Sequence, residues 1–280
     1  MAITSEQVRN LREKTGAGMM DCKRALEESG GDLEKAIEYL RKKGAATAQK
    51  RADKLATEGI IVTRVSQQGK FGVIVEVNCE TDFVARSEDF VGFANVVADV
   101  IEKHSPKTLD ELSALPSPNG KKISDAMNEL LTKVGEKIDI RRFEILKSTD
   151  GLIGGYTHMG SKIGVIVELG GLNGDQEGAV MSRDVAMQVA AMNPQFVRRD
   201  DVPKVIIDRE LEIYKTQARN EGKPDQILER IANGKLEKFY QEMCLVEQSF
   251  IKDAGKTIKD MLGSNTTVRR FQRFHLGDLQ

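Results

Sequence analysis

Hydrophobic residues recur every three or four positions between residues 4 and 43, and glycine-containing breaks at 15–18 and 30–31 divide this pattern into three segments. Thr4 and Gln7 are spaced as a capping box at the start of the first segment. The third segment shows helical spacing at Leu33, Ala36, Ile37 and Leu40. The pattern predicts three short helices in a small bundle, whose thin core we expect to share apolar surface with a partner.

A basic stretch follows this bundle. Residues 41–54, "RKKGAATAQKRADK", carry six basic residues and one acidic residue. Two interpretations remain open, a solvated helical linker and a nucleic-acid contact. A short run of charge is usually a solvated face, so the linker is favoured.

An internal repeat organises the rest of the chain. "GIIVTRVSQQGKFGVIVE" (59–76) aligns without gaps with "GLIGGYTHMGSKIGVIVE" (151–168), at an offset of 92 residues and with eight identical positions. The apolar pattern of each copy predicts two strands joined by a short glycine-containing turn, followed by a helix. The register continues into that helix, where Ala94 and Val97 match Ala186 and Val189.

A second marker closes each copy and shows where the copies differ in length. "IRRFEI" (140–145) matches "VRRFQR" (268–273) at an offset of 128 residues, so copy two carries 36 extra residues. We place this insertion at about 201–241 and predict two antiparallel helices broken at 221–224. The predicted seam contains Ile206, Ile213 or Tyr214, Ile227, Ile231 and Leu236. The hairpin could serve interaction or pack on its parent domain.

Together these patterns predict an α+β fold with three parts. Residues 1–54 form a three-helix N-terminal domain with its basic linker, and residues 55–148 form core subdomain one. Residues 149–280 form core subdomain two with the inserted hairpin. In copy one, the helix after the proline-bearing connection 104–122 is expected to stop at Gly135.

The amino-acid composition does not favour one class of function over another. The 280 residues are 40% hydrophobic and 30% charged, with 42 Lys plus Arg against 43 Asp plus Glu, so overall charge favours neither nucleic acid nor membrane. Three widely spaced cysteines argue against a disulfide framework. The N-terminal "MAITSEQV" does not resemble a signal peptide, and no run is apolar enough for a membrane helix. We expect a cytoplasmic protein.

The sequence offers no catalytic constellation. Its three histidines lack metal-ligand spacing, and phosphate-loop, nucleophile-elbow and dinucleotide motifs are absent. Gly16 and Gly18 lie between two short predicted helices, where a helix-breaking turn is favoured over a phosphate loop. We therefore predict a binding or regulatory protein without catalytic residues, metal or cofactor.

The two copies diverge directly after the shared Gly-Val-Ile-Val-Glu. Copy one continues "VNCETDFVARSEDF", whereas copy two continues "LGGLNGDQEGAVMS", and Thr81–Val84 have no clear counterpart. Phe83 could pack inward from a helix start or project as an exposed probe, and the two interpretations are evenly weighted. His158 aligns with Ser66 at a hairpin turn, where it could be solvated or contact a partner.

Four motifs resemble one family. "LREKTGAGMMDCKRAL" (11–26), "EVNCETDFVARS" (76–87), "KVGEKIDIRR" (133–142) and "YTHMGSKIGVIV" (156–167), in that order, closely resemble bacterial elongation factor Ts. The resemblance covers essentially the whole chain. It implies a ubiquitin-associated-like three-helix head, a duplicated core and a coiled-coil helical hairpin inserted in the second core subdomain.

The resemblance also implies a function. Members of this family are guanine-nucleotide exchange factors for the GTPase elongation factor Tu: they promote GDP release and stay bound until GTP enters. No nucleotide, membrane or nucleic acid is then expected to bind this chain directly, and a homodimer or a two-plus-two complex is possible. A non-catalytic scaffold or chaperone-like binding module is the alternative.

The resemblance carries specific residues with it. In the family, the motif matching Thr81, Asp82, Phe83 and Val84 intrudes into the partner near its magnesium ion. Further partner contacts are implied for Arg12, Met19, Met20, Lys23, Val134, Gly135 and His158. The sequence departs from the family pattern at Arg86, where lysine is familiar, and it stops at "FHLGDLQ", before the C-terminal helical tail of many members.

Overall fold

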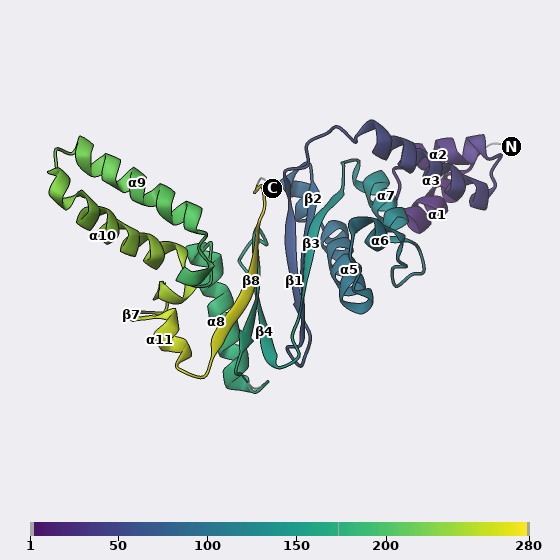
Figure 1. Cartoon of the computed structure of the whole chain (residues 1–280). Coiled ribbons are helices and arrows are strands. Elements are labelled where there is room, and N and C mark those ends of the chain that lie inside the picture. Colours follow the sequence, from purple (N-terminus) through teal and green to yellow (C-terminus); the bar gives the residue numbers. More distant parts are fainter. Residues whose placement is uncertain (1–2, 173, 279–280) are drawn as a thin grey trace.

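The computed structural model describes residues 3–172 and 174–278 and begins with the three predicted helices (Figure 1). These are α1 (Ser5–Thr15), α2 (Met19–Glu28) and α3 (Leu33–Lys50). The capping box forms as expected, since Thr4 Oγ1 accepts from the Gln7 amide at 3.2 Å and the Gln7 side chain accepts from the Thr4 amide at 2.9 Å. Helix α3 continues to Lys50, so most of the basic stretch is helical.

Two three-stranded antiparallel sheets follow, one from each copy of the repeat. Their orders are β1-β2-β3 and β4-β5-β8. The strands are β1 (Glu58–Val65), β2 (Phe71–Cys79), β3 (Asp139–Lys147), β4 (Gly151–Thr157), β5 (Ile163–Gly170) and β8 (Thr267–His275). The predicted hairpins are confirmed, and each Arg-Arg-Phe marker becomes the third strand of its sheet.

The two sheets are related by reciprocal contacts. The Ile61 amide donates to the carbonyl of Ser161, and the Ile153 amide donates to the carbonyl of Gly69, both at 2.7 Å. These two bonds are the same bond under the 92-residue offset. Each copy thus seats its hairpin turn on the first strand of the other, which gives the core an approximate internal two-fold symmetry.

The Arg-Arg-Phe markers of the two copies also make reciprocal contacts. Arg142 donates to the carbonyl of His275 at 3.2 Å, and Arg270 donates to the carbonyl of Lys147 at 3.1 Å. Each arginine also pairs with a buried glutamate of its own sheet, Glu76 at 2.7 Å and Glu168 at 2.8 Å respectively. Buried carboxylates need such partners, so the markers tie the copies together.

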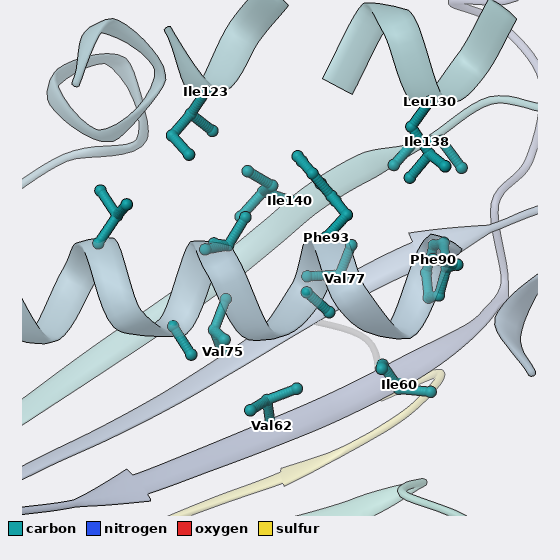
Figure 2. Close-up of a cluster of buried hydrophobic side chains, with 14 of the residues drawn as sticks. Ile60, Val62, Val75, Val77, Phe90, Phe93, Ile123, Leu130, Ile138 and Ile140 are labelled. Atoms are coloured by element: carbon teal, nitrogen blue, oxygen red, sulfur yellow. The ribbon is translucent and has the colours of Figure 1, made fainter. Parts of the chain in front are cut away.

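Successive strand residues point to opposite faces, and this places two apolar layers in the core. The outer face of sheet one packs against α5 (Glu88–His104) and α7 (Ile123–Val134), as Figure 2 shows. The outer face of sheet two packs against α8 (Gln176–Met192). The inner faces meet through Ile61, Ile74, Leu146, Ile153, Ile166 and Phe274. The core is therefore a sheet-on-sheet sandwich with helices outside.

The predicted helical hairpin extends away from the sheets at the end of the molecule opposite the head (Figure 1). Its helices are α9 (Lys204–Asn220) and α10 (Asp225–Met243), with Gly222 at φ 75° in the connection. The predicted seam is partly wrong, because Ile227 is 39% exposed; of the alternatives Ile213 and Tyr214, Ile213 is 38% exposed and Tyr214 is half-buried. Leu236 is buried as predicted, and Ala218, Leu228, Ala232 and Tyr240, which were not predicted, are buried as well.

The remaining elements are short. They are α4 (Asp82–Ala85), α6 (Leu109–Ala114), η1 (Arg199–Asp201), η2 (Leu245–Glu247), β6 (Ser249–Phe250), β7 (Asp253–Thr257) and α11 (Ile258–Leu262). Within the described residues, no helix is both long and apolar enough to cross a membrane.

Candidate partner-binding surface

Phe83 lies in the one-turn helix α4, directly after the end of β2. Ala85 is buried and Val84 is half-buried against the core of sheet one, whereas the side chain of Phe83 is 84% exposed. Thr81 caps this turn, since its Oγ1 accepts from the Val84 amide at 3.4 Å. The helix start predicted here does form, but Phe83 projects from it into solvent and has no role in the core.

Comparison of the two copies shows that the shared fold does not need this phenylalanine. Without gaps, Phe83 aligns with Asp175, the N-cap of α8, whose carboxylate accepts from the Gly178 amide at 2.8 Å. Copy two therefore starts its long helix at this point. Copy one instead makes the separate turn α4 and starts α5 afterwards at Ser87. The turn and its aromatic ring are additions to the scaffold.

A carboxylate from the next loop holds the turn in place. Glu136 Oε2 accepts from the Thr81 amide at 2.9 Å, and its Oε1 accepts from Thr81 Oγ1 at 2.7 Å. Glu136 follows Gly135, which ends α7 in the left-handed conformation at φ 76°. The motif Thr81–Val84 and the turn Val134–Gly135, which are far apart in sequence, are thereby joined.

A second set of bonds connects this region to the end of the head. Glu80 accepts from the Lys137 amide at 2.7 Å and pairs with the Arg51 side chain. These two contacts hold the pKa of Glu80 below its usual value of 4.5. Lys137 Nζ donates in turn to the carbonyls of Ala52 and Lys54, at 2.6 Å and 3.1 Å. Phe83 thus projects from a cross-braced base.

Asp82 presents a negative charge beside the ring. Its carboxylate is 42% exposed and pairs with Arg86 Nη2 at 2.9 Å, one helical turn along the chain. An exposed pair of this kind contributes little to stability, roughly 0.3–0.5 kcal/mol. A partner can therefore draw either charge into a new contact at low cost.

The predicted head residues are also on the surface. Met19 and Met20 are 56% and 69% exposed at the start of α2, and Arg12 and Lys23 are exposed on their helices. The adjacent turn at Gly16 lies against Lys133, whose Cδ would be 2.9 Å from a Cβ at that glycine. Since Lys133 precedes Val134, the head and the end of α7 are neighbours.

His158 also lies at this end of the core, in the turn between β4 and β5. It is exposed in the β4–β5 turn, and its Nδ1 lies 2.9 Å from Tyr156 Oη. In this turn Lys162 Nζ binds Glu58 Oε2 at 3.0 Å. Glu58 opens β1 opposite Cys79, two residues before Thr81. Contacts at Gly16, Glu136 and Glu58 therefore link the segments that carry the predicted site residues in the head, at the end of α7 and in the β4–β5 turn to the Thr81–Val84 turn.

Sequence reasoning missed two exposed apolar side chains in this region. Leu55 and Met159 are 82% and 89% exposed and, with Phe83, are the three most exposed large hydrophobic residues among those described. Leu55 directly follows Lys54, whose carbonyl is bound by Lys137. Met159 directly follows His158. Leu55 and Met159 are each flanked by polar residues in the sequence, and this isolation was the signal that could have identified them as exposed. Glu136 was also missed, although it immediately follows the predicted helix stop.

The described residues give no sign of covalent or metal chemistry here. Within residues 3–172 and 174–278, no group of three or more His, Cys, Asp or Glu could hold a metal ion. Cys79 is buried, and burial together with Glu136 raises the pKa of its thiol to about 12.

Known proteins are similar to this sequence over nearly its full length. The sequence model of the family described as elongation factor TS matches residues 80–278. Elongation factor Ts of Chlorobium phaeobacteroides is 45% identical, with 98% of this chain and 99% of the relative aligned. Elongation factor Ts of Clostridium perfringens is 44% identical, with 99% and 93% aligned. The predicted resemblance is confirmed, and the chain belongs to the elongation factor Ts family of translation factors.

Proposed function

We propose that the chain is a guanine-nucleotide exchange factor for elongation factor Tu in translation elongation. It binds the GDP-loaded GTPase, perturbs the magnesium and phosphate site so that GDP leaves, and remains bound until GTP enters. One observation carries the proposal: Phe83 is 84% exposed on a turn that Glu136 holds through two hydrogen bonds. Family membership supports the choice of partner.

Phe83 acts as a wedge in this mechanism. Magnesium demands near-octahedral geometry and bridges phosphate oxygens, so a small displacement of its surroundings weakens the hold on GDP. An exposed aromatic ring gains about 2 kcal/mol when it is buried between partner side chains. The braced turn prevents the ring from moving aside, so the partner must yield instead.

Asp82 adds an electrostatic contribution. Placed near the partner's phosphate site, its carboxylate repels the β-phosphate and competes for the groups that surround the ion. Arg86, its ion-pair partner in the free protein, is exposed and able to turn toward the GTPase. Asp82 does not need to ligate magnesium for this effect.

The energies required are modest. A 10,000-fold acceleration of release needs about 5.5 kcal/mol of differential stabilisation. Linkage makes the effect reciprocal, so bound nucleotide weakens this chain's grip on the GTPase by the same factor as the chain weakens nucleotide binding. Exchange proceeds without covalent chemistry in this chain, which we therefore propose is not itself an enzyme, and its place of action is the cytoplasm, with translation.

The experiment measures release of fluorescent GDP from elongation factor Tu, with wild type, Phe83→Ala and a matched control, Val205→Ala. Val205 is 72% exposed on α9, away from the proposed surface. Wild type and Val205→Ala should accelerate release, and Phe83→Ala should be about 30-fold slower, the equivalent of about 2 kcal/mol.

Two other outcomes have distinct meanings. Equal acceleration by all three proteins keeps the exchange function but removes Phe83 from its mechanism. Binding to the GTPase without any acceleration by wild type contradicts the exchange function and favours the non-catalytic scaffold.

A further inference from the structure

Strand β8 is the outer strand of sheet two and, among the residues that the structure describes, pairs only with β5. A groove of about 670 Å³ runs beside it and is lined by all five residues 269–273. Because successive strand residues point to opposite faces, five consecutive lining residues place the groove along the edge of the strand. Among the described residues, no backbone hydrogen bond joins Arg269–Arg273 to any element other than β5. The edge is open.

The other wall of the groove is the segment 193–197. The backbone of this segment is bound on its far side, where the Phe196 amide donates to the Met243 carbonyl at 3.0 Å and the Leu245 amide donates to Phe196 at 2.9 Å. The Val246 amide likewise donates to Val197 at 3.1 Å. The wall is therefore fixed, and the groove lies between a fixed wall and an open strand edge.

Arg273 lies in this groove with an unused donor. Its side chain is only 15% exposed, and its Nε is buried without a hydrogen-bond partner in the described structure. The carboxylate of Asp278 approaches its Nη1 only to 4.0 Å. By contrast, Arg269 and Arg270, which also line the groove, are bound to Glu168 at 3.2 Å and 2.8 Å. Of the three arginines that line the groove, Arg273 is therefore the one with a side-chain donor free to bind a further acceptor.

The internal repeat shows that the fold does not require this arginine. Its counterpart at the 128-residue offset is Ile145, which packs against the core of sheet one. The two positions have equivalent registers, since Arg273 lies opposite Val165 and Ile145 lies opposite Val73. A partly desolvated guanidinium costs stability where an isoleucine would not. A charge that merely protects an edge strand would be exposed, and this one is not.

We propose that the groove binds an extended acidic segment of another protein, which adds as a strand to the edge of β8. Backbone hydrogen bonds along Arg269–Arg273 supply affinity, and an Asp or Glu carboxylate of the segment accepts from Arg273. The groove is lined by three arginines against two aspartates, Asp201 and Asp278, and the Nε of Arg273 has no partner among the described residues, so charge complementarity favours an acidic segment. This interaction is separate from nucleotide exchange, because it uses sheet two and none of the residues around Phe83.

The test selects phage-displayed random octapeptides on full-length wild type, Arg273→Ile and a control, Arg209→Ile, which changes an exposed arginine of α9. Arg273→Ile installs the residue that copy one has at this position, so we expect a folded variant, checked by thermal unfolding. Wild type and Arg209→Ile should enrich peptides with an acidic residue at a fixed position. The most enriched peptide, once synthesised, should bind Arg273→Ile at least 10-fold more weakly than it binds wild type, as expected for loss of a charged hydrogen bond.

Hydrogen exchange then tests the mode of binding. The selected peptide should slow amide exchange within residues 269–273 of wild type. No acidic enrichment, equal binding to Arg273→Ile, or a bound peptide that leaves exchange at 269–273 unchanged would each overturn the proposal.

Discussion

Phe83 is exposed because of what its neighbours do. Thr81 is held by Glu136 on one side and Ala85 is buried on the other, so a turn of four residues has no freedom to fold the ring inward. We infer that the role of Glu136 is to position the turn, since it binds both the amide and the hydroxyl of Thr81. Its two bonds come from a charged acceptor, and such bonds contribute roughly 1.5–3 kcal/mol each.

Substitution of Glu136 therefore tests whether rigidity matters. Glu136→Gln keeps the size of the side chain but leaves a single uncharged acceptor oxygen, so the two bonds that Thr81 donates cannot both be accepted. We expect GDP release from elongation factor Tu to slow about 10-fold. The matched control is Glu129→Gln on α7, which removes a charge that binds only Lys121 among the described residues.

The readout that separates positioning from simple loss of structure is affinity for the nucleotide-free GTPase. Affinity should change little for Glu136→Gln, because the surface is intact and only its stiffness is reduced. An unchanged release rate would show that exchange does not depend on the bonds between Glu136 and Thr81.

At the scale of elements, the head is attached by the close approach of two helices. Gly44 in α3 is buried against α7, and a Cβ at this position would lie 2.3 Å from Thr132 Oγ1 and 3.3 Å from the Asn128 carbonyl. Arg41 reinforces the contact through Asp125 at 3.1 Å. The glycine weakens its own helix by roughly 0.5–1 kcal/mol relative to alanine, and close packing is the compensation.

Two glycine substitutions should therefore act in opposite directions. Gly44→Leu should lower the thermal unfolding midpoint by about 3 °C or more, because overpacking costs roughly 1–3 kcal/mol. Gly234→Leu in α10 should raise the midpoint slightly, because nothing lies within 4 Å and leucine favours helices. Limited proteolysis in residues 51–57 should increase only for Gly44→Leu. Equal midpoints would mean that α3 is not held by this contact.

At the scale of the whole molecule, the internal two-fold symmetry decides which segments meet. It seats the β4–β5 turn on the start of β1 through the bond from Ile61 to Ser161. Met159 in that turn and Leu55 before β1 consequently lie at the end of the core that carries Phe83. These three exposed apolar side chains come from segments that lie far apart in the sequence.

This arrangement predicts that Leu55 and Met159 contribute to affinity. The double variant Leu55→Ser, Met159→Ser should raise the Kd for nucleotide-free elongation factor Tu at least 30-fold, the equivalent of about 2 kcal/mol of lost apolar burial. Val205→Ser is the matched control and should leave the Kd unchanged. Titration calorimetry measures both, and a double variant as tight as wild type would confine the interface to the other residues.

Much of the fold was predictable because its signals are local. Helical spacing, capping residues and glycine stops act over a few residues, and they located the head helices, the end of α7 at Gly135 and the break in the hairpin. The repeat extended that knowledge from one copy to the other. The seam of the helical hairpin was predicted less well, since Leu228 and not Ile227 is buried. Which residues of one helix become buried depends on the helix that packs against it.

Most of the elements, the duplication and the family of this chain could be predicted from its residues, because these features depend on spacing and identity along one chain. The exposure of Phe83, the bonds from Thr81 to Glu136 and the unused donor of Arg273 beside an open strand edge became visible only in the folded molecule. These facts depend on which distant groups come within a few ångströms of each other. Packing and hydrogen bonding between the two copies set those distances.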